Sequence, residues 1–152
     1  MLIVQFVVAF LVVILDQLVK LWSINVLEPM GKLPVIEGVF NLRYVENTGA
    51  AFSMLEGKTA FLIIVPAIAC IAMIYLLASR RIKSKVGSWA ITFVLAGAMG
   101  NLIDRIIRGA VVDLFDFELI NFPVFNVADI AVTIGAVLFF IYVIFFYEDK
   151  KK

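Results

Sequence analysis

Three short polar motifs follow one another in the second half of the chain: GNLIDR at residues 100–105, VVD at 111–113 and FNVAD at 125–129. The first ends a long apolar run, and the last opens another. Aspartates and amide side chains are costly at the edge of a membrane, so their presence there indicates a functional site. The long runs on either side decide the fold, because each has about the length that crosses a bilayer.

The composition is typical of an integral membrane protein. Of the 152 residues, 64% are hydrophobic and 16% are charged, whereas soluble proteins have roughly half apolar and about a quarter charged residues. The net charge of +1 gives no basic surface, so no nucleic-acid partner is expected. The chain has no histidine, which excludes Ser-His-Asp and Cys-His catalytic groups, a His-ligated zinc and a haem with a proximal histidine. The single cysteine, Cys70, lies in an apolar run and is expected to pack there.

Four apolar runs predict four transmembrane helices. The first is uncharged over residues 1–15 and continues to Trp22 across Asp16 and Lys20. It has neither a basic leading segment nor a small-residue cleavage site, so we expect it to stay in the mature protein. The others are uncharged runs at residues 59–79, 86–103 and 130–147. We therefore predict an all-α integral membrane protein that forms a single membrane-embedded domain over residues 1–152.

The basic residues predict the orientation of these spans. RRIKSK occupies residues 80–85 between the second and third spans, and EDKKK ends the chain at 148–152. Short basic loops stay in the cytoplasm, so both termini are expected on that side. The loops at 23–58 and 104–125 then face outward. All of the costly polar motifs consequently lie at the outer boundary of the membrane.

The outer loops are expected to form a small extracytoplasmic β-cradle on the membrane surface. Residues 39–45 alternate in polarity, which places Phe40, Leu42 and Tyr44 on one apolar face of a strand. NTG at 47–49 is typical of a turn. Residues 114–123 combine aromatic and charged side chains, which favours an interfacial loop.

Asp113 and Asp129 suggest the chemistry of paired carboxylates. Two carboxyl groups brought together in a poorly solvated site share a proton. The ionised group can take a proton from water, while the protonated group polarises an amide carbonyl and later protonates the leaving amine. Spacing alone favours a plainer interpretation, in which Asp113 is a loop residue and Asp129 is stabilised by the dipole at a helix N-terminus.

The amides near these carboxylates each have two interpretations. Asn126 shares a helical face with Asp129 and is either the N-cap or a group that orients a carboxylate or a peptide backbone. Asn101 shares a face with Arg105, whose plainer role is to anchor a helix at the interface. Asn47 is either a turn residue or an amide that reaches over a substrate.

Two further features concern helix packing. Asp16 and Lys20 form an i, i+4 pair in the favoured order, which is either a structural ion pair or part of the site. Small residues on the third span allow another helix to approach closely; these are Ala96, Gly97, Ala98 and Gly100.

Five motifs together resemble those of the bacterial lipoprotein signal peptidases, the signal peptidase II family. They are LDQLVK at 15–20, ENTGAAFS at 46–53 and the three motifs quoted above. Their order and spacing, with the four spans, match the family over nearly the whole chain. A single one of these motifs would be a weak signal, whereas the set is specific.

The resemblance implies an aspartic endopeptidase of the bacterial cytoplasmic (inner) membrane that cleaves prolipoproteins before a diacylglyceryl-modified cysteine, near the extracytoplasmic face. It implies Asp113 and Asp129 as the catalytic dyad, with no metal and no cofactor. Expected partners are diacylglyceryl-modified prolipoproteins and membrane lipid, and we expect a monomer. The family's other functional positions fall on Asp16, Lys20, Asn47, Gly100, Asn101, Arg105 and Asn126.

Three other functions fit part of the pattern. Intramembrane carboxylates also mark ion or proton routes, but the inner half of each span has none, so no route crosses the membrane. A lipid head-group transferase would use clustered aspartates on a divalent ion, and the chain lacks such dense spacing on one helix. Sensitivity to a chelator distinguishes that enzyme from a metal-independent peptidase. A non-enzymatic lipoprotein chaperone would differ only in turnover.

Overall fold

Four long apolar helices and a small sheet make up the fold. The computed structural model describes residues 1–49 and 57–146, and the four predicted spans are confirmed as helices long and apolar enough to cross a membrane. Residues 50–53 of the ENTGAAFS motif and the basic end of the chain lie outside the described residues. In chain order the elements are α1 (Leu2–Trp22), the π-helical turn η1 (Ser23–Leu27), α2 (Glu28–Met30), β1 (Lys32–Ile36), β2 (Phe40–Asn47), α3 (Thr59–Ala78), α4 (Lys85–Arg108), β3 (Val111–Asp116), the 3-10 turn η3 (Glu118–Ile120) and α5 (Val127–Phe146).

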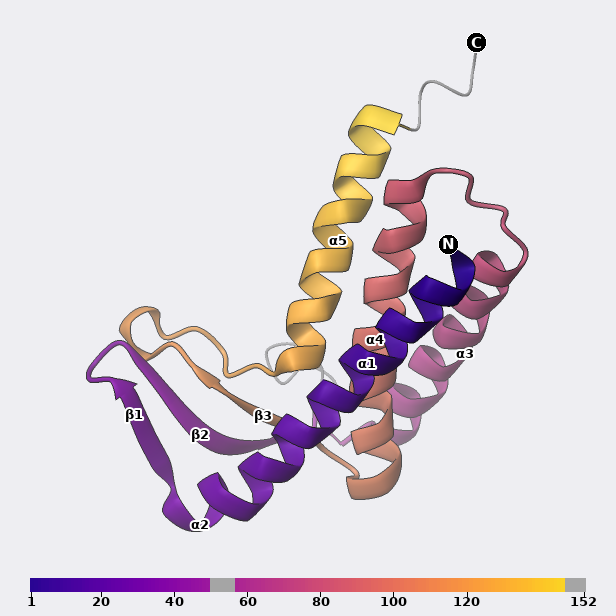
Figure 1. The fold of residues 1–152 in the computed structure, drawn as a ribbon. Helices are drawn as coiled ribbons and strands as arrows, with labels where there is room; N and C mark the ends of the chain where they lie inside the picture. Colours follow the sequence, from indigo (N-terminus) through magenta and orange to yellow (C-terminus); the bar gives the residue numbers. More distant parts are fainter. Residues whose placement is uncertain (50–56, 147–152) are drawn as a thin grey trace.

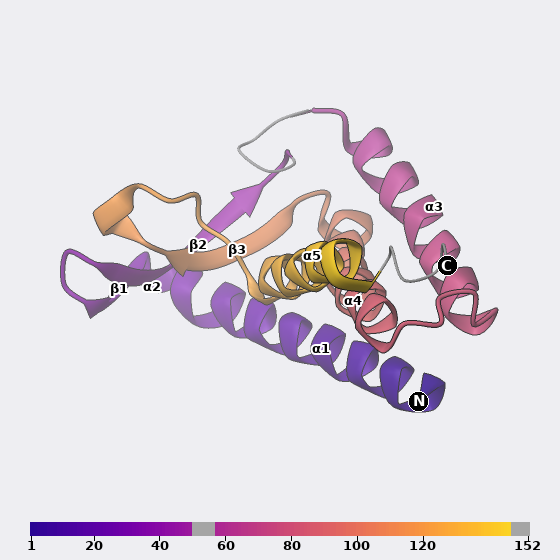
Figure 2. The same ribbon diagram turned by 90° about the horizontal axis from the view of Figure 1, so that it is seen from above.

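Helix α4 is the centre of the bundle. It contacts α1, α3 and α5, and the view from above in Figure 2 shows it among them. Half of its most apolar stretch is buried, against 17% for each of the other three spans, which therefore present their apolar side chains outward. Figure 1 shows the sheet at one end of the bundle and the start of α1 with the α3–α4 loop at the other. Cys70 packs inside with Leu77 and Leu95, as predicted.

Glycines on α4 permit the close helix contacts that the small residues predicted. A Cβ atom on Gly97 would overlap the carbonyl oxygen of Ala128 on α5. A Cβ atom on Gly100 would lie 2.6 Å from Asp16 Oδ2 on α1. Any larger side chain at these positions would push the helices apart. The close approach matters because it brings α1, α4 and α5 together where their polar residues lie.

Two helices extend further than the sequence predicted. The first span continues through η1 and α2 to Met30, so the outer loop does not begin at residue 23. It ends at Gly31, which has a positive φ of 85° that suits glycine. Helix α4 passes the predicted end at residue 103 and stops at Gly109, whose φ is 79°. The last stretch of α4 can include charged residues because their side chains have partners inside the fold, described below.

The sheet is antiparallel, with strand order β1-β2-β3. The strand predicted at 39–45 is β2, whereas β1 and β3 were not predicted as strands. The predicted apolar face is wrong in one respect, because Asn41 is the buried residue of β2. The register between β2 and β3 shifts between Leu42 and Val45, and Asn41 Nδ2 donates to Glu118 Oε2 at 2.8 Å.

The segment after β3 forms the interfacial loop. Phe117 stacks on Phe125 with ring centroids 5.9 Å apart, so part of its aromatic surface is packed. Three other large apolar side chains of the segment are exposed, namely Leu119, Ile120 and Phe122. Exposed apolar side chains beside a bundle of membrane spans favour contact with the lipid interface.

Candidate active site

Asp113 and Asp129 line one cavity of about 560 Å³ at the sheet end of the bundle. Asp113 is on β3, and Asp129 is in the first turn of α5. Asp113 is buried and Asp129 is half-buried, so Asp129 is the more exposed of the two to water. The cavity is also lined by Asn47, Asn101 and Arg105 and by apolar residues of the loop before α5 and of α5 itself: Phe122, Pro123, Val124, Phe125, Ile130, Val132 and Ile134.

Asn126 connects the two carboxylates. Its side-chain Nδ2 donates to Asp113 Oδ1 at 2.6 Å and to Asn101 Oδ1 at 3.1 Å. Its Oδ1 accepts from the backbone N–H of Asp129 at 2.9 Å, and its own backbone N–H donates to Asp129 Oδ2 at 3.1 Å. This reciprocal pair is a capping box. Both interpretations of Asn126 therefore hold, because the residue caps α5 and orients both carboxylates.

Two more amides fix the remaining carboxylate oxygens. Asn47 Nδ2 donates to Asp113 Oδ2 at 3.1 Å, and Asn101 Nδ2 donates to Asp129 Oδ1 at 2.8 Å. Asn47 is itself held by a turn, since its Oδ1 accepts from the backbone N–H of Gly49 at 3.0 Å. The turn predicted at 47–49 thus supports an amide that contacts Asp113. Each oxygen of both carboxylates accepts a hydrogen bond, which sets their orientation.

The environment of Asp113 favours its protonated form. Burial is the largest cause, and the neighbouring charge of Asp129 is the next; together they raise the pKa of Asp113 to about 6. The hydrogen bonds from Asn47 and Asn126, and the charge of Lys20, act in the opposite direction and limit the rise in pKa. A buried carboxyl beside a second carboxylate is the arrangement that holds a shared proton.

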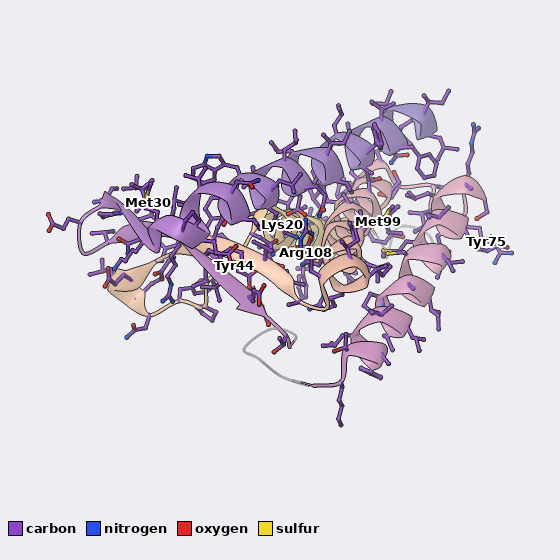
Figure 3. All side chains as sticks on the ribbon, turned by 90° about the horizontal axis from the view of Figure 1, so that it is seen from below. Lys20, Met30, Tyr44, Tyr75, Met99 and Arg108 are labelled. Carbon is purple, nitrogen blue, oxygen red and sulfur yellow. The ribbon has the colours of Figure 1, made fainter. Side chains whose placement is uncertain are left out.

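A buried group of charges lies behind the cavity. Lys20 Nζ is 2.9 Å from Asp16 Oδ2, from Asp104 Oδ2 and from Asn101 Oδ1. Lys20 is fully buried, and both aspartates are 1% exposed or less. Arg108 Nη1 lies 2.7 Å from the other oxygen of Asp104. In Figure 3, Lys20 on α1 and Arg108 on α4 lie near each other where the sheet meets the helices.

This buried group joins four elements of the fold. Asp16 Oδ1 on α1 accepts from the backbone N–H of Ala128 at the start of α5, at 2.8 Å. Asp104 Oδ2 on α4 accepts from the backbone N–H of Val112 on β3, at 3.1 Å. Those two backbone groups immediately precede Asp129 and Asp113 in the chain. The cluster therefore fixes the backbone that carries each carboxylate.

The predicted residues fall into two layers. Asn47, Asn101, Arg105, Asp113 and Asp129 line the cavity, and Asn126 bridges the carboxylates. Asp16, Lys20 and Gly100 do not line it and lie in or beside the buried charge group. The sequence motifs included Gln17 and Asp104 without assigning either a role, and they did not include Arg108. The i, i+4 spacing of Asp104 and Arg108 was the available signal.

Arg105 contributes a positive charge to the cavity wall. Its Nη2 donates to the backbone carbonyl of Gly49 at 2.7 Å. It is half-buried, and its charge is attracted to Asp129, Asp113 and Asp104. The plainer role of Arg105 as an outward anchor does not describe this position. The guanidinium instead connects α4 to the turn that holds Asn47.

The sequence profile of a known family covers most of the chain. A profile described as Signal peptidase (SPase) II matches residues 8–145. The chain belongs to the signal peptidase II family. A lipoprotein signal peptidase of Clostridioides difficile (strain 630) is 43% identical over 145 residues, which cover 95% of this chain and 97% of that protein. One from Enterococcus faecalis (strain ATCC 700802 / V583) is 41% identical over 152 residues, covering 100% of this chain and 94% of its own.

Solved structures share this fold. A bacterial membrane enzyme solved in meso at 2.3 Å has a TM-score of 0.85 and 34% identity, with 92% of this chain and 87% of that chain covered. A second, solved at 1.9 Å, has a TM-score of 0.83 and 34% identity, with 94% of each chain covered. As a signal peptidase II, the protein is a multi-pass membrane peptidase that removes signal peptides from lipoproteins.

Proposed function

We propose that this signal peptidase II is an aspartic endopeptidase that cleaves prolipoproteins immediately before a diacylglyceryl-modified cysteine, with Asp113 and Asp129 as the catalytic dyad. One observation carries the proposal: both carboxylates line one cavity and share the bridging amide of Asn126. The different burial of the two groups suggests different roles, because the more buried carboxyl keeps its proton to higher pH.

The half-buried Asp129 is the general base in this mechanism. Its ionised carboxylate takes a proton from water as the water oxygen bonds to the scissile carbonyl carbon. The protonated Asp113 donates a hydrogen bond to the carbonyl oxygen and stabilises the tetrahedral intermediate. The C–N bond then breaks, and the leaving amine takes a proton from the dyad. Arg105, on the same wall, provides a positive charge that attracts the Asp129 carboxylate.

The rest of the cavity suits a lipidated substrate. Its other wall is formed by aromatic and aliphatic side chains that include Phe125, Val132 and Ile134. An apolar wall next to polar groups accommodates acyl chains while the scissile bond lies at the carboxylates. A transmembrane signal helix carries its lipidated cysteine to the membrane boundary, where this cavity lies if the spans cross as proposed.

The proposed setting is the bacterial cytoplasmic membrane. The basic loop at 80–85 lies at the end of the bundle opposite the sheet, which favours cytoplasmic termini and a cavity near the extracytoplasmic face. The enzyme is proposed to act as a monomer in which residues 1–152 form one peptidase domain.

The purified protein should cleave a diacylglyceryl-modified prolipoprotein in detergent with a chelator present. The expected product, identified by mass spectrometry, begins at the modified cysteine, and the same precursor without the diacylglyceryl group should be cut much more slowly. Equal cleavage of both precursors would contradict recognition of the lipid by the apolar wall. Binding of the modified precursor without cleavage would instead favour a chaperone.

The reaction should slow as the solution becomes more alkaline. Because Asp113 must be protonated and its pKa is raised to about 6, kcat/KM should fall as pH rises through about this value. The two carboxyls titrate as a pair, so the measured value belongs to the dyad. Bound acyl chains exclude water and raise the pKa further, so the fall in kcat should lie at higher pH. A kcat/KM that rises steadily between about pH 5 and about pH 8 would contradict Asp113 as the acid.

A further inference from the structure

A second cavity lies at the end of the bundle away from the sheet. Its volume is about 340 Å³, and no residue that lines it also lines the cavity of Asp113 and Asp129. Its lining comes from the beginning of α1, the end of α3, the loop after α3 and the beginning of α4. Figure 1 shows these segments together at that end of the bundle. The lining residues are Met1, Leu2, Gln5, Leu76, Leu77, Arg80, Ile82, Lys83 and Ser88.

Gln5 presents an unsatisfied donor at this cavity. Its side chain is 2% exposed, and its Nε2 has no hydrogen-bond partner among the described residues. A buried donor without a partner costs about 1–3 kcal/mol of stability. An amide –NH₂ group can only donate, so the missing partner is an acceptor. Ser88, the lining residue on α4, uses its hydroxyl proton on the carbonyl of Lys85 at 3.0 Å.

Two cations face the same space. Arg80 and Lys83 line the cavity from the α3–α4 loop, and neither forms an ion pair with a described residue. No aspartate or glutamate is among the lining residues. Arg80 has a φ of 51°, a left-handed conformation that is uncommon for a residue with a side chain. A buried donor and two unpaired cations fit an anion.

We propose that this cavity binds the phosphate head group of an anionic phospholipid from the leaflet at this end of the bundle. A phosphodiester provides acceptors for Gln5 Nε2 and a bidentate partner for the Arg80 guanidinium. The apolar part of the lining, which includes Leu2, Leu76 and Ile82, suits the glycerol and upper acyl region. Basic pockets between membrane helices are typical sites for such lipids.

The apolar surroundings favour a phospholipid over free phosphate. The α1 and α3 surfaces next to the cavity present exposed aliphatic side chains, such as Ile3 at 80% and Ile74 at 39% exposure. Acyl chains can lie on those surfaces while the head group enters the cavity. A bound lipid would then connect α1, α3 and α4 at the end where no sheet holds them. The proposal does not depend on the peptidase reaction, since the site is separate from the dyad.

Lipid titration of the full chain in neutral phosphatidylcholine nanodiscs tests the proposal. Phosphatidylglycerol should bind saturably and raise the thermal unfolding temperature, whereas additional phosphatidylcholine should not. The Arg80→Ala and Lys83→Ala substitutions should each weaken phosphatidylglycerol binding by about fivefold, and the double variant by about 25-fold. Both side chains are exposed, so these variants should fold normally. Gln5→Leu should also weaken phosphatidylglycerol binding. A cooperative thermal unfolding transition of this variant, measured without the anionic lipid, serves as the check that it is folded.

Arg81→Ala is the matched control. Arg81 is an exposed cation of the same loop, does not line the cavity, and lies over the ring of Tyr75, which Figure 3 shows on α3. An equal loss of binding in Arg81→Ala would mean general attraction to a charged membrane and would overturn the proposal. So would unchanged binding in Gln5→Leu, equal binding of phosphatidylcholine, or saturation of the site by inorganic phosphate alone with the same affinity.

Discussion

Cleavage of the lipidated precursor is lost, by about 10³-fold or more, when either Asp113 or Asp129 is replaced by asparagine. Asparagine keeps the size of the side chain but can neither take a proton from water nor donate one to the leaving amine. Because the two carboxyls act on the same water and carbonyl, each single variant should be nearly as inactive as the double variant. The measurement is kcat/KM for the diacylglyceryl-modified precursor, with precursor binding measured in parallel.

The matched control is Asp116→Asn. Asp116 is on the same strand as Asp113 but pairs with Arg43, with Nε and Oδ2 2.9 Å apart, and does not line the cavity. This variant should keep cleavage within a few-fold of the unchanged protein. Cleavage retained by Asp113→Asn or Asp129→Asn would remove the dyad assignment. Loss in all three variants would indicate damage to the sheet rather than to catalysis.

The unfolding temperatures of these variants show whether a loss of cleavage comes from catalysis or from misfolding. The pKa of Asp113 is raised when the protein folds, so the folded state binds the proton more tightly than the unfolded state does. This carboxyl therefore destabilises the fold increasingly as pH rises from its ordinary pKa of 3.8 through about 6. Asparagine removes that charge. At neutral pH, Asp113→Asn should unfold at a temperature no lower than the unchanged protein does.

The spans and the cavity residues could be predicted because the membrane makes polar groups rare. Uncharged runs of the right length mark spans whatever their partners are. Residues such as Asp113, Asn126 and Asp129 are conspicuous in such a chain, and their motifs carried the family resemblance. Their arrangement around one cavity is a tertiary property, however, and depends on the glycines that let α1, α4 and α5 approach.

The features that were missed depend on contacts between distant segments. The sequence suggests that Asp104 starts a loop, whereas the helix continues past it because Asp104 pairs with Arg108 one turn later and with Lys20, which is far away in sequence. Five of the six residues of strand β3 are buried, so its sequence does not alternate between polar and apolar residues as a half-buried strand does. Asn41 is buried where it pairs with Asp116 on β3 and where Glu118 accepts its hydrogen bond, and neighbouring residues in the chain do not reveal these partners.

Mutation of the buried charge group should strongly lower the stability of the protein, just as mutation of the dyad should strongly lower its catalytic activity. Replacing Lys20 with methionine leaves Asp16 without its cation and Asp104 with Arg108 alone. Breaking a buried ion pair on one side costs about 3–5 kcal/mol, because an unpaired charge remains out of water. We expect Lys20→Met to accumulate poorly or to unfold at a much lower temperature, measured in detergent.

Two comparison variants make this expectation specific to the buried cluster. Lys32→Met breaks an ion pair with Glu118 whose side chains are 45% and 46% exposed, so it should leave the unfolding temperature almost unchanged. Adding Asp16→Asn to Lys20→Met removes the unpaired charge, while the amide oxygen can still accept from the backbone N–H of Ala128. That double variant should recover part of the lost stability.

If the double variant is no more stable than Lys20→Met, the charge at Asp16 does not explain the loss. If the recovered protein still cleaves slowly, the contact from Lys20 to Asn101 also positions Asp129, since Asn101 donates to that carboxylate.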